Sequence, residues 1–255
     1  MPYTVILDAG HGGYDAGASY NGRMEKDDTL RLALLVGEIL ERNCIDVKYT
    51  RTEDVYDSPY EKAMIGNNSG ADLFVSIHRN AYLTPNTSKG VETLVFNDEG
   101  VKAKLARNIN SNLAKLGFDN RGVIERPNLV VLKRTKMPAV LVEAGFIDND
   151  SDNELFDEKF GEIGEAIAKG IIDTVGGGCD GNNQRKLYKV QVGAYYERQD
   201  AQMLLDELKG QGFPAYMMYE DGVYKVMSGA FAILDNAVKM EERLSRMGYN
   251  TFITT

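Results

Sequence analysis

Short apolar runs alternate with stretches of helical periodicity over the first 175 residues. Six runs have the length and apolar character of strands: residues 4–7, 47–50, 73–77, 91–96, 130–132 and 139–142. Between the first two runs, apolar or small residues recur on one helix face at Leu30, Ala33, Leu34, Gly37 and Leu40. Strands that alternate with helices predict the α/β class, with a mostly parallel or mixed sheet covered by helices on both faces.

Two capping signals predict where further helices begin. Ser58 and Glu61 have the spacing of a capping box, and Pro59 between them suits the first turn. Ser151 and Glu154 repeat the signal before a terminal helix that follows the last predicted strand. A single helix is therefore expected from this signal to the end of the region.

A glycine-rich segment divides the chain. Residues 176–184 contain four glycines and no apolar run, which is typical of a flexible linker. We therefore expect a first domain at residues 1–177, a linker at residues 178–186 and a second domain at residues 187–255.

The second domain contains an internal repeat with a period of 36 residues. Residues 188–195 (YKVQVGAY) match residues 224–231 (YKVMSGAF), and each copy reads strand, helix, strand. A tight turn at residues 220–222 joins the copies. The pattern predicts a small ferredoxin-like βαββαβ domain, in which two helices cover one sheet face and the other face is free for a ligand.

Composition and charge exclude two classes of protein. The net charge is -9, and the acidic excess lies in residues 1–177, with 28 acidic against 20 basic residues, whereas residues 178–255 have 10 against 9. A nucleic-acid-binding protein needs a basic face, so no nucleic acid partner is expected. No run approaches the roughly 20 apolar residues of a membrane span.

The first residues and the two cysteines indicate in which cellular compartment the protein is made. The first residues lack the basic and long apolar regions of a signal peptide, so synthesis in the cytoplasm without an export signal is expected. Cys44 and Cys179 are too few for a disulfide scaffold in a chain of this length. Both are expected to be free thiols.

The candidate chemistry lies at the ends of predicted strands. His11 and His78, the only histidines, each directly follow a strand, and in open α/β sheets ligands bind beyond the carboxyl ends of strands. Glu25 precedes the first helix and Glu143 ends an apolar run. Two histidines and a glutamate form a common catalytic zinc site, and a second acid is needed to move a proton.

Each of these residues also has an ordinary structural explanation. A histidine at a strand end is often structural or exposed, and Glu25 suits the positive end of a helix dipole. Glu143 is harder to explain in this way, because a carboxylate at an apolar strand end needs a partner. From spacing alone, a metal site and purely structural roles both remain open.

Five segments together resemble the zinc-dependent N-acetylmuramoyl-L-alanine amidases of bacterial autolysins, sporulation amidases and phage endolysins. They are residues 6–13 (ILDAGHGG), 25–27 (EKD), 71–81 (ADLFVSIHRNA), 121–123 (RGV) and 137–146 (MPAVLVEAGF). The segments span the first domain in the family's order. The resemblance implies a twisted mixed sheet flanked by helices, and hydrolysis of the amide bond between N-acetylmuramic acid and L-alanine in peptidoglycan.

The resemblance also implies residue roles. His11, Glu25 and His78 match the zinc ligands, and Glu143 matches the catalytic glutamate. Asn80 is expected to line the site beside the second histidine and contact substrate.

The second domain resembles the SPOR domain through residues 188–195 and the βαββαβ pattern. The resemblance implies binding to peptidoglycan glycan strands, especially strands without stem peptides. Gln191, Tyr195, Tyr219 and Met227 are the candidates for the exposed, glycan-binding face.

Other functions are compatible with the same residues. One is a zinc amidase that acts on a different amide or ester, and another is a non-catalytic adaptor that binds the wall. Without an export signal, a lytic amidase fits either a phage endolysin released through a holin or an enzyme of mother-cell lysis. In both cases the protein would act at the cell wall only after its release.

Overall fold

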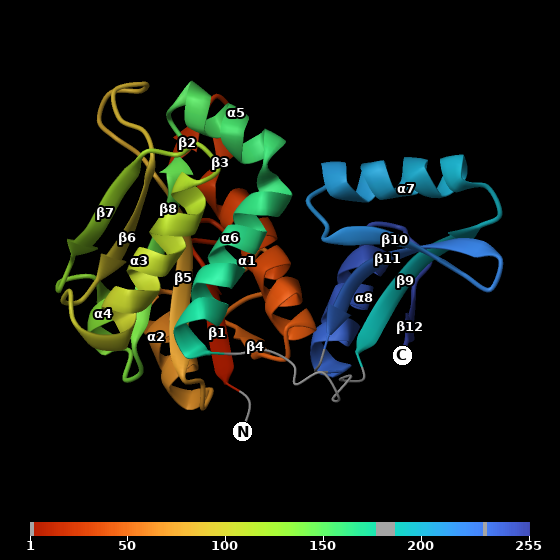
Figure 1. Cartoon of the computed structure of the whole chain (residues 1–255), viewed down its shortest axis with the longest axis horizontal. Helices are drawn as coiled ribbons and strands as arrows, with labels where there is room; N and C mark the ends of the chain where they lie inside the picture. Colours follow the sequence, from red (N-terminus) through yellow and green to blue (C-terminus); the bar gives the residue numbers. More distant parts are fainter. Residues whose placement is uncertain (1–2, 177–186, 232–233) are drawn as a thin grey trace.

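The computed structural model describes residues 3–176, 187–231 and 234–255, and its elements form two units (Figure 1). The first unit, residues 3–176, is built on a six-stranded sheet of order β4-β1-β5-β8-β6-β7. Its strands are β1 (Thr4–Ala9), β4 (Asp46–Tyr49), β5 (Leu73–Asn80), β6 (Val91–Val95), β7 (Asn120–Glu125) and β8 (Ala139–Phe146). Neighbouring strands are parallel except β6 and β8, so the predicted mixed α/β sheet is confirmed.

Helices cover both faces of this sheet. One core lies beneath α1 (Glu25–Arg42), α3 (Gly100–Ala114) and α6 (Phe160–Val175), and a smaller core lies beneath α2 (Pro59–Asn68) and α4 (Val130–Arg134). Because both faces are buried, the central strands β1 and β8 contain continuous apolar runs rather than alternating ones. A short hairpin, β2 (Ser19–Tyr20) and β3 (Arg23–Met24), precedes α1, and α5 (Asp150–Glu158) follows β8.

Two predictions about this unit's strands were wrong. The run at residues 130–132 forms helix α4, because a short apolar run does not distinguish a strand from one buried helical turn. Strand β7 was not predicted. It is an edge strand that is exposed or half-buried throughout, so its sequence lacks an apolar run.

The helix starts are partly as predicted. The capping box at α2 is confirmed, with the Glu61 amide donating to Ser58 Oγ and the Ser58 amide donating to Glu61 Oε2. The terminal helix, in contrast, is divided into α5 and α6 at Lys159. Its first cap is Asn149, whose side chain accepts from the Asp152 amide, rather than Ser151.

The second unit, residues 187–231 and 234–255, has the predicted ferredoxin-like arrangement. Its antiparallel sheet has the order β10-β11-β9-β12. The elements are β9 (Tyr188–Tyr195), α7 (Arg198–Gly210), β10 (Ala215–Glu220), β11 (Val223–Phe231), α8 (Leu234–Arg246) and β12 (Phe252–Thr254). Asp221 and Gly222 both have positive φ, as a type I′ hairpin turn requires, so the turn between the repeats is confirmed.

Two of the four residues expected on the open face of this sheet lie on that face but are buried, and the other two lie on the opposite face. Gln191 and Met227 are register partners, but they are only 8% and 1% exposed, and β11 packs against α1 of the first unit. Tyr195 and Tyr219 both lie next to Tyr224, on the face that packs against the helices. The alternation of residues along the sequence could not predict these positions, because it reveals neither the register shifts between β9 and β11 nor the packing of α1 against the sheet.

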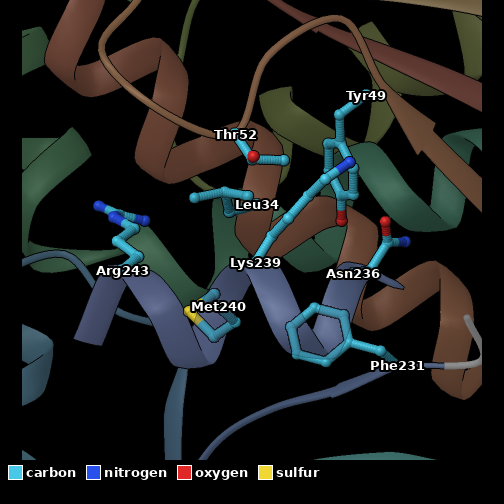
Figure 2. Close-up of a pocket in the computed structure, with 8 residues that line it drawn as sticks. All are labelled: Leu34, Tyr49, Thr52, Phe231, Asn236, Lys239, Met240 and Arg243. Carbon is cyan, nitrogen blue, oxygen red and sulfur yellow. The ribbon is translucent and has the colours of Figure 1, made fainter. Parts of the chain in front are cut away.

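The two units meet where α8 faces α1 and β4 (Figure 1). Asn236 donates to Glu41 Oε1 at 3.0 Å, and both guanidinium nitrogens of Arg246 bind the Glu53 carboxylate at 2.8 and 3.0 Å. Figure 2 shows the pocket between these elements. Its lining residues are Leu34, Tyr49, Thr52, Phe231, Asn236, Lys239, Met240 and Arg243. Apolar contact and two polar links therefore join the units.

The structure tests one of the two cysteine predictions. Cys44 is disulfide-bonded, so the prediction of a free thiol is wrong for this residue. It follows the end of α1 with a φ of 60°. Cys179 and the expected linker at residues 178–186 lie outside the described residues. Within the described residues, no helix has both the length and the apolar character to cross a membrane.

The crossing of α6 over α3 gives a test of this packing. A Cβ at Gly170 would lie 2.6 Å from Ile109 Cγ1 and 2.8 Å from its backbone nitrogen. Gly170→Ala is expected to lower the free energy of unfolding by about 1–3 kcal/mol through overpacking. The intrinsic helix preference of alanine, about 1 kcal/mol, acts in the opposite direction.

Gly161 in the same helix provides the matched control, because a Cβ there would meet nothing within 4 Å. Gly161→Ala should leave stability unchanged or raise it by up to about 1 kcal/mol. Urea unfolding of both variants makes the comparison. Equal stability of the two variants would contradict the packing described here.

Candidate active site

The strand ends bring four candidate residues into one crevice. His11 follows β1, His78 lies near the end of β5, and Glu143 lies in β8 as the register partner of His78. Glu25 is the first residue of α1. The arrangement of these elements around the sheet thus brings together residues that are more than 100 positions apart in the sequence.

Three of these residues form a group that could hold a metal ion. His11, Glu25 and His78 each offer a ligand atom, and the three atoms lie within 4.8 Å of one another. Glu25 Oε2 is 3.1 Å from His11 Nε2, and Glu25 Oε1 is 2.9 Å from His78 Nδ1. Two imidazoles and one carboxylate are the donor set of a catalytic zinc site that keeps a fourth position open.

The backbone around the group leaves room for its side chains. A Cβ at Gly10 would lie 2.4 Å from the His78 ring, and one at Gly17 would lie 2.6 Å from both Glu25 Oε2 and His11 Cδ2. Gly17 also has a φ of 66°. Glycine is therefore required at both positions for the ligand side chains to converge.

Neighbouring groups orient the donors. Asp15 Oδ2 lies 2.9 Å from His11 Nδ1, which directs Nε2 of that ring toward Glu25. The amides of Ala18 and Arg79 donate to the two oxygens of Glu25 at 2.9 and 3.0 Å. The carboxylate is thus fixed from both sides although its side chain is almost fully buried.

Electrostatics at the group favour a cation. Burial lowers the pKa of His11, but the carboxylates of Glu25 and Asp15 raise it to about 9. Burial raises the pKa of Glu25, but its hydrogen bonds to the two histidines hold that pKa well below its usual range. The site therefore stabilises positive charge beside Glu25, as a metal ion would require.

Two basic side chains anchor the loop that carries His11. Lys62 donates to the carbonyl oxygens of Ala9 and His11, and Arg51 donates to the carbonyl oxygens of Ala9 and Gly10. Arg51 and Lys62 are both buried. These contacts could not be predicted from sequence patterns, since each joins segments more than 40 residues apart.

Glu143 has the setting of a proton acceptor. Its side chain is partly exposed in the crevice, but Oε2 is buried and has no hydrogen-bond partner among the described residues. Burial raises the pKa of Glu143 to about 7, with His78 opposing the rise and Glu25 and Glu92 adding to it. A carboxyl group that titrates near neutral pH can accept a proton and return it.

Asn80 lies two residues beyond His78 on the same strand. Its Nδ2 donates to Glu92 Oε1 at 3.1 Å, and its Oδ1 accepts from the amide of Ala81. A role for Asn80 in contacting substrate therefore stays a prediction. Glu92 was not predicted from sequence, yet it is the register partner of Glu143 and lies beside the site.

Both parts of the chain are similar to known protein families. Residues 5–173 match the family described as N-acetylmuramoyl-L-alanine amidase, and residues 184–255 match the SPOR domain. The chain is 34% identical to N-acetylmuramoyl-L-alanine amidase CwlM of Bacillus licheniformis, over 85% of each protein. It is also 39% identical to an endolysin of Bacillus phage SPP1, over 68% of this chain and 66% of that protein.

A solved structure shares the fold of the first unit. The crystal structure of an N-acetylmuramoyl-L-alanine amidase from Clostridium difficile 630 superposes with a TM-score of 0.64 and 35% identity. The match covers 71% of this chain and 99% of that one.

The three converging donors predict stabilisation by a divalent cation. Addition of Zn²⁺ to chelator-treated protein, at about 100 times the dissociation constant, should raise the free energy of unfolding by about 2.7 kcal/mol. In a domain of this size, that corresponds to a rise in Tm of about 5–10 °C. His78→Ala should abolish the rise, whereas Glu143→Gln, which leaves the three donors intact, should keep it. Thermal unfolding measures the effect, and an unchanged Tm in the unsubstituted protein would count against a metal site.

Proposed function

The chain belongs to the N-acetylmuramoyl-L-alanine amidase family, and on that basis we propose that it hydrolyses the amide bond between N-acetylmuramic acid and L-alanine in peptidoglycan. We further propose that a zinc ion, held by His11, Glu25 and His78, is required. The observation that carries the proposal is the convergence of these three donors beside Glu143, whose Oε2 has no hydrogen-bond partner in the described part of the chain.

The roles of the residues follow from their positions. A bound zinc ion would act as a Lewis acid toward water and the scissile carbonyl. Glu143 faces the same crevice and has a pKa raised to about 7, so it can take a proton from the attacking water. Glu143 then returns that proton to the nitrogen of the leaving L-alanine. Asp15 keeps the His11 ring in one orientation throughout.

The second unit is proposed to hold the enzyme on the wall. We assign catalysis to residues 1–177 and binding of glycan strands to residues 187–255, which lie entirely within the match to the SPOR domain. On the sheet face away from α7 and α8, Phe252 is the register partner of Gln191 and is 53% exposed. An exposed aromatic ring at this position suits stacking against a sugar.

The proposed biological role is wall lysis by an enzyme that acts outside the cytoplasm. The relatives of this chain include a phage endolysin and a sporulation-specific amidase of Bacillus subtilis, and the latter match covers 85% of each protein. The disulfide at Cys44 supports action in an oxidising environment. A phage endolysin and an amidase of mother-cell lysis both fit this description.

Digestion of purified peptidoglycan tests the reaction. Cleavage at the proposed bond should release new N-terminal alanine without new reducing sugar. Glu143→Gln should lower the rate by a factor of roughly 100 to 10,000, because it removes the proton acceptor, while the zinc content measured after purification is unchanged. New reducing ends, or a Glu143→Gln variant of full activity, would contradict the proposal.

Binding to stripped glycan strands tests the role of the second unit. In the full chain carrying Glu143→Gln, replacement of Phe252 with alanine should weaken sedimentation with glycan strands by about tenfold, the usual effect of removing a central aromatic contact. Tyr196→Ala is the matched control, since Tyr196 is 84% exposed but lies outside the sheet. Equal losses in both variants would argue against binding at this face.

A further inference from the structure

A row of acidic and basic side chains extends beyond the proposed catalytic residues. His78 on β5 pairs in register with Glu143 on β8, and Glu143 pairs in register with Glu92 on β6. Directly paired residues point to the same face of a sheet, so all three side chains share one face. Arg121 on the edge strand β7 continues the row, because its Nε donates to Glu92 Oε2 at 3.0 Å.

The guanidinium of Arg121 is oriented by its neighbours. Besides the bond to Glu92, Arg121 Nη1 donates to the carbonyl oxygen of Lys89 at 3.4 Å. The Cζ atom of Arg121 lies 5.1 Å from the centre of the Phe146 ring. Glu92 is itself held by Asn80 at 3.1 Å. The Nη2 of Arg121 has no hydrogen-bond partner within the part of the chain that the structure describes, and the side chain is 40% exposed. One edge of a fixed cation is therefore available to a ligand.

The distance from the reacting atoms suits the leaving peptide. Neighbouring strands are about 4.8 Å apart, so Arg121, two strands from Glu143, lies about 10 Å away along the sheet. In an extended peptide, the residue after the L-alanine lies within about 7 Å of the scissile amide, and its carboxyl groups lie further away. The position of Arg121 thus matches the second residue of a stem peptide.

The charge of the substrate also indicates that Arg121 faces the stem peptide rather than the glycan. The lactyl carboxyl of the muramic acid forms the scissile amide, so the glycan at this point carries no charge, whereas the acidic second residue of a stem peptide does. Glu92 and Glu143 lie in the same row of side chains, so a stem-peptide carboxylate at this position would be repelled by two acidic side chains without a compensating cation beside it. A guanidinium supplies that compensation in a geometry that fits a carboxylate.

On the basis of the proposed function, we infer that Arg121 binds a carboxylate of the stem peptide on the leaving-group side of the scissile amide. Arg121 is a specificity-determining residue in this account, and Glu92, Asn80 and Phe146 are the residues that position it.

The test compares two synthetic substrates with the zinc-loaded full chain. One is N-acetylmuramoyl-L-alanyl-D-glutamate and the other is the same compound with both carboxyl groups converted to amides. Arg121→Ala should lower kcat/KM for the acid by about 10- to 100-fold, mainly through KM, and change that for the diamide less than about twofold. Arg121→Lys should retain part of the preference for the acid. Arg126 directly follows the opposite end of β7, and among the described residues its side chain donates only to the Glu125 carbonyl oxygen, so Arg126→Ala should have no effect.

The outcomes separate this inference from the proposed function. Equal losses on both substrates in Arg121→Ala, or an unchanged rate on the acid, would overturn the assignment of Arg121. Failure of the unsubstituted chain to cleave either substrate would overturn the proposed reaction. In that case, calorimetric binding of L-alanyl-D-glutamate to the unsubstituted chain and to Arg121→Ala still decides the inference: weaker binding to the variant supports it, and equal binding overturns it.

Discussion

The buried carboxylate of Glu25 is the interaction on which the site depends. It contacts both histidines, and backbone amides of two separate segments donate to its two oxygens. A carboxylate buried in this way is costly unless positive charge or hydrogen bonds compensate it, so its presence at the start of α1 ties the loop after β1 to the end of β5. Glycines at positions 10 and 17 make the approach possible, and Asp15 sets the orientation of the His11 ring.

The same loops connect the site to the second unit. Arg246 of α8 binds Glu53, and the next residue, Asp54, accepts from the amide of Gly13 beside the His11 loop. Asn236 is bonded to Glu41 near the end of α1, the helix that begins with Glu25. The wall-binding unit in this proposal is thus joined by short contacts to two of the three segments that carry metal donors, the loop after β1 and α1.

Sequence patterns predicted the architecture, because apolar runs identify buried strands. They also placed the candidate active site, because the carboxyl ends of parallel strands lie at the same edge of the sheet. They failed where tertiary packing decides: residues 130–132 form a helix, β7 lacks an apolar run, and Met227 is buried on a sheet face expected to be open. His11 and His78 were candidates from spacing, whereas the role of Glu25 depended on the family resemblance. Glu92 gave no chemical signal, and Arg121 appeared only within the RGV segment that resembles the family, since their place beside the site follows from strand order and register.

The central claim is that His11, Glu25 and His78 bind one catalytic metal ion. Crystals of the zinc-loaded protein, measured on both sides of the zinc absorption edge, test it most directly. The account predicts a single strong anomalous peak about 2.0–2.2 Å from His11 Nε2, His78 Nδ1 and a Glu25 oxygen, with Glu143 facing it. A peak elsewhere in the molecule, or none between these three side chains in a protein that cleaves peptidoglycan, would contradict it.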